Sequence, residues 1–282
     1  MTDADLALYE ARESSGRSRY AYYSSQMRKK IDGRRQVINA LDRAIAEESF
    51  RVVYQPQIDL ATGKLYGFEA LCRFKDDLYY PNEFIPVAES VGLIVEVDRI
   101  VTKKVVEQMR AWRDAGFEIP SVSINYSPIQ LKDTKYCSWL KGLLDEARIP
   151  ARLIKIEVTE SGSFDDEKAQ QFFSEVHETG MQLALDDYGT GYSTLNAISV
   201  YPMDFIKLDK SVNDSHLQPG SEYYLESLVT FIHDLGRRLV AEGVEDEVQI
   251  ELARKLKIDY IQGYYYSPPV DATKAETWLA RT

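Results

Sequence analysis

Short apolar segments alternate with longer helical segments from residue 50 onward, and this alternation constrains the fold more than any other feature of the sequence. The segments typical of strands are 50–57, 64–73, 121–126, 153–160, 182–187, 205–209, 238–242 and 260–267. Helices are expected at 34–48, 99–115, 128–148, 167–179, 223–235 and 247–257. Strands joined by crossover helices form a parallel sheet. Eight of them predict an α/β fold in which the sheet closes into a (β/α)8 barrel.

One connection departs from this pattern. The first two expected strands are separated only by residues 59–63, DLATG. Such a loop is too short for a parallel crossover but suits a hairpin, so we expect the first strand to run antiparallel to the second. The connection between the second and third strands is long, and we expect an additional short helix there at 86–92.

Apolar and polar side chains alternate along several expected strands. In 153–160, one face carries Ile154, Ile156 and Val158, and the other carries Lys155, Glu157 and Thr159. The same alternation recurs in 121–126, 182–187 and 205–209. A half-exposed sheet would explain one such strand. Repeated in crossover topology, the pattern favours a barrel whose polar set faces the interior near the carboxyl ends of the strands, where barrel enzymes place their chemistry.

Composition and charge narrow the class of protein. Hydrophobic residues at 44% and charged residues at 28% are typical of a soluble globular protein. No apolar run reaches the length of a membrane span, and the N-terminus lacks the basic start and apolar core of a signal peptide, so we expect a cytoplasmic chain. A net charge of −11 argues against long nucleic acid as a partner. It leaves room for a small anionic substrate carried in by metal ions.

The cysteines and histidines exclude several chemistries. Cys72 and Cys137 are far apart and belong to no metal-spaced cluster, so we expect buried free thiols. The three histidines, at positions 177, 216 and 233, are also scattered. This removes most zinc sites and most mechanisms with a histidine-activated nucleophile.

The segment 183–195, LALDDYGTGYSTL, places Asp186 and Asp187 at the end of an apolar strand and directly before Gly189 and Gly191. Neighbouring side chains of a strand point to opposite faces. Both acids can therefore serve one site only where the pleat is interrupted, which we expect at the glycines. The alternative is a solvated acidic pair before a glycine turn.

Further acidic and amide side chains would collect at the same end of the barrel. They are Glu69, Asn125, Glu157, Asp186, Asp187, Asp209, Glu242 and Glu245, with Lys207 as the evident cation. Clustered carboxylates raise one another's pKa values unless a cation compensates them. Oxygen ligands favour Mg²⁺ or Mn²⁺, whereas Ca²⁺ binds but is poorly suited to catalysis. Two ions that share Asp186 would activate a water and stabilise a phosphorane-like transition state.

The N-terminal segment has a different character from the rest. Residues 5–29 begin with an amphipathic stretch and break at 14–16 into a basic, tyrosine-rich piece. This segment resembles the last helix and tail of a GGDEF diguanylate cyclase domain, which commonly stands just before a second domain. An ordinary connecting helix is the alternative. We therefore expect residues 1–30 to be a GGDEF-like C-terminal tail with a linker helix, and residues 31–282 to form the main domain.

Seven motifs in one order carry a closer resemblance. They are GFEALCRF, INYSPIQL, IEVTES, LDDYGTGYSTL, FIKLDKS, VAEGVE and YIQGYYYSPP. From about Gln36 to the C-terminus, the chain resembles the EAL family of cyclic di-GMP phosphodiesterases. The resemblance implies a TIM-like (β/α)8 barrel with an antiparallel first strand. It also implies metal-dependent hydrolysis of cyclic di-GMP to linear 5′-pGpG in bacterial second-messenger signalling.

The resemblance assigns roles motif by motif. It implies that Glu69, Asn125, Glu157 and Asp186 hold a first metal, and that Asp186, Asp187 and Glu242 hold a second. It implies that Lys207 contacts the attacking water or the scissile phosphate, although a structural pair with Asp209 is the competing interpretation. Glu69, Lys207, Glu242 and Asp187 form the expected catalytic set.

Other matched positions imply supporting roles. Gln55, Arg73, Asp209, Glu245 and Gln262 are expected around the substrate, with Glu245 supporting the metal ligands and the forked donors of Arg73 suited to a phosphate. Glu160 is expected to brace the loop after Asp187. In the family the 188–195 loop also helps to form a homodimer. Ser127 and Pro128 are interpreted as a helix N-cap and first turn.

The sequence also departs from the family pattern. Phe74 stands where Trp is frequent, and the following segment 75–84 is short and lacks the usual His-Pro. The tyrosines at 264–266 would either stack on guanine or pack in the last strand. No expected metal ligand is missing, which favours an active enzyme over a receptor that binds cyclic di-GMP without turnover. A two-metal hydrolase of another phosphodiester is the third candidate, and upstream GGDEF and sensory domains are expected partners in the full-length protein.

Overall fold

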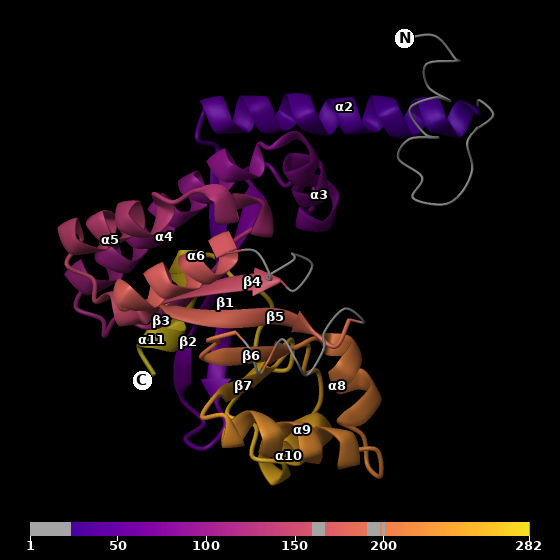
Figure 1. Ribbon diagram of the computed structural model, residues 1–282, viewed down its shortest axis with the longest axis vertical. Helices are drawn as coiled ribbons and strands as arrows, with labels where there is room; N and C mark the ends of the chain where they lie inside the picture. The colour runs from indigo at the N-terminus through magenta and orange to yellow at the C-terminus, as the bar shows by residue number, and fades with distance from the viewer. Residues whose placement is uncertain (1–23, 160–166, 191–197, 199–200, 282) are drawn as a thin grey trace.

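The computed structural model describes residues 24–159, 167–190, 198 and 201–281, and it places eight strands in one closed barrel (Figure 1). The strands are β1 (Phe50–Asp59), β2 (Leu65–Phe74), β3 (Ser121–Asn125), β4 (Ile154–Thr159), β5 (Gln182–Tyr188), β6 (Phe205–Leu208), β7 (Arg238–Ala241) and β8 (Tyr260–Gln262). Neighbours in the barrel follow the order of the chain. The predicted α/β barrel is confirmed.

Strand β1 runs antiparallel to both of its neighbours, β2 and β8, whereas the other neighbouring pairs are parallel. The hairpin predicted from the short 59–63 loop is therefore correct, and Gly63 supplies its left-handed residue at φ 71°. The reversed strand places Gln55 opposite Glu69 and Gln57 opposite Gln262. Two glutamines of β1 thus enter the same interior as the acidic residues.

Helices surround the barrel (Figure 1). They are α2 (Ser25–Ala46), α3 (Pro81–Val91), α4 (Ile94–Asp114), α5 (Tyr136–Glu146), α6 (Glu167–Glu178), α8 (Lys210–His216), α9 (Tyr223–Asp234), α10 (Glu247–Lys255) and α11 (Ala272–Leu279), with 3-10 turns η1 (Pro128–Lys132) and η2 (Ala151–Leu153). The predicted helix at 86–92 starts earlier, because the Tyr80 N–H donates to Glu83 Oε2 at 2.8 Å and caps the helix at Pro81.

Two further boundaries differ from the sequence prediction. The expected helix 128–148 is divided into η1 and α5, because Asp133 leaves helical geometry at φ −85° and ψ 86°. The last strand was expected to reach residue 267 but ends at Gln262. A Cβ atom at Gly263 would lie 2.0 Å from the Val244 carbonyl oxygen, so the chain passes close to another backbone segment and turns there.

Helix α2 begins at Ser25, nine residues before the predicted start at residue 34. Ser24 caps it by accepting a hydrogen bond from the Met27 N–H at 3.3 Å. Its buried residues all lie in the C-terminal half, from Val37 to Ala44. The first half extends past the barrel wall (Figure 1).

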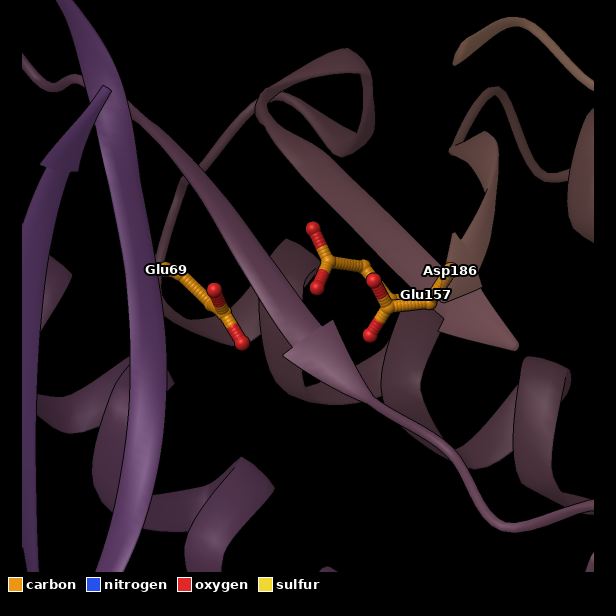
Figure 2. Close-up of side chains that lie close together, drawn as sticks. All are labelled: Glu69, Glu157 and Asp186. Carbon is orange, nitrogen blue, oxygen red and sulfur yellow. The ribbon is translucent and has the colours of Figure 1, made fainter. Parts of the chain in front are cut away.

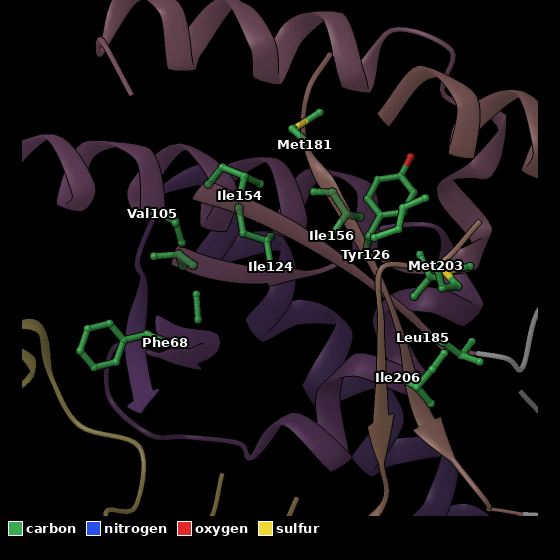
Figure 3. Close-up of a cluster of buried hydrophobic side chains, with 14 of the residues drawn as sticks. Phe68, Val105, Ile124, Tyr126, Ile154, Ile156, Met181, Leu185, Met203 and Ile206 are labelled. Carbon is green, nitrogen blue, oxygen red and sulfur yellow. The ribbon is translucent and has the colours of Figure 1, made fainter. Parts of the chain in front are cut away.

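The core has two layers, as the alternation of side chains predicts. Ile154, Ile156 and Leu185 belong to the outer layer, between the strands and the helices (Figure 3). A small second cluster inside the barrel contains Ala184, Phe205, Val240 and Tyr260, with Tyr66 packed against it. The polar side chains of the same strands therefore share the interior with few apolar neighbours.

The structure tests the predictions for the two cysteines and for membrane-spanning helices. Cys137 is a buried free thiol as predicted, whereas Cys72 is free but only half-buried, because its strand position lines a cavity. Among the described helices, none has both the length and the apolar character that crossing a membrane requires.

Candidate metal centre

Three carboxylates from three strands meet inside the barrel. Glu69 of β2, Glu157 of β4 and Asp186 of β5 are all buried and point toward one another (Figure 2). Each offers an oxygen that lies within 4.8 Å of those of the others. Asp186, Asp187 and Glu242 form a second group by the same criterion. The two groups share Asp186, as an arrangement for two neighbouring cations requires.

Asn125 joins the first group from the end of β3. Its Nδ2 donates to Glu69 Oε1 at 3.0 Å. The following turn is fixed by Ser127, whose Oγ accepts from the Ile129 N–H at 3.4 Å and donates to Glu89 Oε1 at 2.7 Å. The predicted cap at Ser127 is thus confirmed, and it anchors the backbone two residues after Asn125.

Asp187 reaches the site because the backbone leaves the strand conformation at that residue. Its φ is 58°, in the left-handed region that non-glycine residues seldom adopt. The pairing of β5 with β6 shifts register between Leu185 and Tyr188. The Asp187 N–H donates to Asp186 Oδ1 at 3.0 Å. The pleat is therefore interrupted at the second acid itself, before the glycines at which the sequence predicted the interruption, because Asp187 adopts the left-handed conformation.

Lys207 is the cation at the centre of both groups. Its Nζ lies 2.6 Å from Glu157, 2.7 Å from Glu242, 3.0 Å from Asp186 and 3.4 Å from Glu69. The lysine is 1% exposed. Its ammonium thus compensates part of the negative charge of four carboxylates.

Asp209 has a different contact. Its side chain caps α8 by accepting from the Ser211 N–H at 2.9 Å. The alternative in which Lys207 is paired with Asp209 is therefore wrong for the described structure, because the lysine side chain is directed to the acidic groups instead. The predicted substrate contact of Asp209 stays a prediction.

Burial and mutual repulsion raise several pKa values in the cluster. Burial raises the pKa of Glu157 and of Glu242. Burial and the neighbouring Asp186 raise the pKa of Asp187 to about 6. Burial opposes ionisation of Glu69 as well, but Lys207 and donated hydrogen bonds hold its pKa below the ordinary value. One ammonium therefore does not keep all of these carboxylates ionised, and a bound divalent cation would supply the missing compensation.

Gln262 of β8 contacts Glu69, and glutamines of the antiparallel strand contact Gln262. Gln262 Nε2 donates to Glu69 Oε2 at 2.6 Å and to Gln55 Oε1 at 3.0 Å. Gln55 Nε2 in turn donates to the Ser267 carbonyl at 3.2 Å. The structure therefore brings two predicted substrate-binding residues to the metal centre. Gln57, which donates to Gln262 at 2.9 Å, was not singled out, although it follows Gln55 at the strand's two-residue period.

A cavity of about 250 Å³ opens beside the acidic cluster. Its lining includes Glu69, Asn125, Arg73 and Asp98. Arg73 is half-buried, and its Nη1 donates to the Cys72 carbonyl at 2.7 Å. Asp98 is buried, and burial raises its pKa to about 8. Sequence reasoning missed Asp98, although its spacing of four from Ile94 and three from Val101 places it on the apolar face of a helix.

The remaining predicted residues lie at the margin or outside the described part. Glu245 is largely exposed and pairs with Lys210 at 3.3 Å. Tyr264 and Tyr265 are exposed in the turn after β8, so neither packs in a strand. Glu160 and residues 191–195 of the predicted dimer loop lie outside the described residues. Their roles stay predictions.

The donor set fits a hard divalent cation. Each group consists of carboxylate oxygens, with no sulfur or imidazole. Among the described residues, Glu157 Oε1 is a buried oxygen without a hydrogen-bond partner. A buried acceptor of this kind costs free energy unless a cation or donor satisfies it. The cluster is able to bind a metal.

The fold and the cluster define a barrel protein with an acidic metal centre at the carboxyl ends of its strands. A family model described as the EAL domain matches residues 38–269. The chain belongs to the EAL domain family. Solved members of this family share the same barrel, as the structural comparison shows.

Three similar proteins illustrate this relationship. The chain is 33% identical to the signaling protein YkoW of Bacillus subtilis and 34% identical to the cyclic di-GMP phosphodiesterase PdeR of Escherichia coli, in each case over 99% of the chain. It spans 35% of YkoW and 42% of PdeR. The solved PaMucR phosphodiesterase, a c-di-GMP complex, superposes with a TM-score of 0.77 at 27% identity, covering 85% of this chain and 99% of that one.

Proposed function

We propose that this EAL domain is a metal-dependent, cyclic-guanylate-specific phosphodiesterase that hydrolyses cyclic di-GMP to linear 5′-pGpG. The observation that carries the proposal is the pair of acidic groups that share Asp186. Similarity to PdeR and to PaMucR supplies the substrate class. In this reaction a water oxygen bonds to phosphorus, the bond from phosphorus to one 3′ oxygen breaks, and that oxygen takes up a proton.

The residues divide the work as follows. Glu69, Asn125, Glu157 and Asp186 would hold one Mg²⁺ or Mn²⁺, and Asp186, Asp187 and Glu242 would hold the other. Bound divalent cations supply Lewis-acid charge and lower the pKa of a bound water. Lys207 places a positive charge beside the reacting phosphate, and its ammonium favours the ionised forms of Glu69, Glu157 and Glu242.

The substrate would enter from the cavity beside Glu69. Arg73, at its wall, carries forked N–H donors suited to a phosphate or a guanine edge. Gln262, which also donates to Gln55, orients Glu69, and Asp209 and Glu245 complete the rim. A cytoplasmic location of the domain, as the sequence predicts, belongs to the same proposal.

The proposal extends to the rest of the protein. Curated relatives align with 99% of the chain, and so with residues outside the 38–269 family match. We propose a GGDEF-like tail in residues 1–30 and an EAL domain in 31–282, with upstream GGDEF and sensory domains as partners. A homodimer through the 188–195 loop belongs to the same proposal.

Incubation with cyclic di-GMP and Mn²⁺ or Mg²⁺, followed by chromatography, tests the function. We expect pGpG with either ion and none with Ca²⁺, although Ca²⁺ should still bind. If cyclic di-GMP binds but pGpG forms with neither Mn²⁺ nor Mg²⁺, the proposed phosphodiesterase activity is contradicted and a receptor function is favoured. Other cyclic dinucleotides serve as competitors to test substrate class.

A further inference from the structure

Lys155 is a fully buried cation below the acidic cluster. It lies on β4 two residues before Glu157, on the same face, and its side chain is 0% exposed. Its Nζ lies 3.7 Å from the ring centroid of Phe205 and 4.9 Å from that of Tyr66. Burial lowers the pKa of Lys155, whereas Glu157 and the aromatic faces favour the ammonium. The mechanism proposed above does not use this residue.

A chain of hydrogen bonds connects Lys155 to Glu69 through two side-chain amides. Lys155 Nζ donates to Gln57 Oε1 at 3.4 Å, and Gln57 Nε2 donates to Gln262 Oε1 at 2.9 Å. Gln262 Nε2 then donates to Glu69 Oε2 at 2.6 Å. All four side chains are buried. Water therefore does not compete for these groups as it would at the surface.

The two ends of the chain have opposite hydrogen-bonding character. An ammonium carries donors and no acceptor, whereas a carboxylate carries acceptors and no donor. Each glutamine amide between them has one end of each kind. If both amides were reversed, an NH₂ group would face Lys155 and an amide oxygen would face Glu69. Both contacts would be repulsive, so the lysine and the carboxylate select one orientation of the chain.

We infer that Lys155 is a positioning residue: it fixes the amides of Gln57 and Gln262 so that Gln262 presents an N–H to Glu69 and holds its carboxylate toward the metal. The inference rests on the proposed function in one respect, because it takes Glu69 as a metal ligand. Its action is indirect, since two amides separate the lysine from the carboxylate.

The principal test replaces Lys155 by methionine, which is also unbranched but has no donor. Calorimetric titration with Mn²⁺ alone is expected to give about tenfold weaker binding, the lower end of what the loss of an outer-shell partner causes. Side-chain amide NMR signals of Gln57 and Gln262 in the metal-free protein are expected to move. A merely structural role would change thermal stability without moving these two readouts.

A double-mutant cycle shows whether Lys155 acts through Gln57. If the lysine acts on Glu69 through this amide, the double variant Lys155→Met/Gln57→Leu is expected to bind Mn²⁺ no more weakly than Gln57→Leu alone. Lys155→Gln, which keeps an N–H donor without the charge, is expected to fall between Lys155→Met and wild type. Additive losses would overturn the inference.

Arg238→Met is the matched control. The Arg238 guanidinium lies over the same Phe205 ring at 4.2 Å but donates to Tyr260 at 3.3 Å, away from the glutamine chain. Arg238→Met is expected to bind Mn²⁺ as wild type does. If it loses as much Mn²⁺ affinity as Lys155→Met, the effect comes from long-range charge, and the positioning role is overturned. Wild-type protein that binds no Mn²⁺ would refute the proposed metal centre. If wild-type protein binds Mn²⁺ and Lys155→Met shows the same Mn²⁺ affinity and the same glutamine amide signals, only the role of Lys155 is refuted.

Discussion

Asp187 follows Asp186 directly, yet both carboxylates belong to one group of ligand atoms, because the backbone at Asp187 turns left-handed with φ 58°. In a regular strand the two side chains would point to opposite faces. The N–H of Asp187 donates to Asp186 Oδ1 at 3.0 Å and ties the two residues together. A locally unfavourable conformation therefore gives one strand two ligands, which is typical of strain at functional sites.

Gly189 should be intolerant of a side chain. Its φ is 104°, and an added Cβ would lie 2.1 Å from Val212 Cγ2. We expect Gly189→Ala to lower the free energy of unfolding by about 2 kcal/mol or more, from backbone strain and the clash together. Urea unfolding measures this difference. Gly142→Ala is the control: it lies in α5 with nothing within 4 Å of the added Cβ, and it should gain about 0.5–1 kcal/mol. Equal stability of Gly189→Ala and wild type would show that the loop relaxes freely.

Glu69→Gln removes a carboxylate charge while keeping the side chain's shape. Metal charge contributes several kcal/mol to such reactions, so we expect turnover to fall on the order of 10²- to 10³-fold. The fold should persist, because Lys207 keeps three carboxylate partners. Chromatography of pGpG and far-UV circular dichroism provide the two measurements. Exposed Glu107→Gln, outside the centre, is the control, and near wild-type turnover in Glu69→Gln would remove Glu69 from the metal ligands.

Arg73→Met tests the cavity as the substrate entrance. A charge-assisted hydrogen bond contributes about 1.5–3 kcal/mol, so KM for cyclic di-GMP should rise on the order of 10- to 100-fold. We expect kcat to change less, because the hydrogen bond of Arg73 within the described residues goes to the Cys72 carbonyl and not to the acidic groups. Arg51→Met, which removes the arginine opposite Arg73 on β1 together with its surface pairs to Asp77 and Asp271, is the control for loss of nearby positive charge. A fall in kcat at constant KM would place Arg73 in the chemical step instead.

Asp98 should make stability depend on pH. The unfolded chain releases this proton near the ordinary pKa of 3.8, whereas the folded protein keeps it up to about 8. The folded state thus binds more protons between these values, and its free energy of unfolding falls as the pH rises. Asp98→Asn cannot titrate, so its advantage over wild type should grow from pH 5 to pH 8 by up to about 1.4 kcal/mol per pH unit.

Urea unfolding of the metal-free protein in EDTA measures the Asp98 effect at both pH values. Glu107→Gln serves as the control, because its side chain is exposed on the same helix. A constant difference between Asp98→Asn and wild type at pH 5 and pH 8 would mean that Asp98 is already ionised in the folded protein.

Most of the fold could be predicted from local sequence patterns, because side-chain alternation and loop length depend on neighbouring residues alone. The two-residue alternation in β4 predicted that Ile156 and Glu157 lie on opposite faces of the strand. The five-residue loop 59–63 predicted that β1 runs antiparallel to β2. The predicted ends of strands and helices were wrong where a single contact determines the end of the element. Gly263 ends β8 because its missing Cβ admits the Val244 carbonyl, and no periodicity in the sequence records that approach.

The sequence by itself determined the barrel, its reversed first strand and the set of acidic residues that face the interior. Only the tertiary structure decided which atoms meet: Lys207 among four carboxylates rather than beside Asp209, and Gln57 against Gln262, which lies 205 residues away. Side-chain period fixes the face on which a residue lies. Partners across the interior depend on barrel closure and register, which bring together residues far apart in the chain.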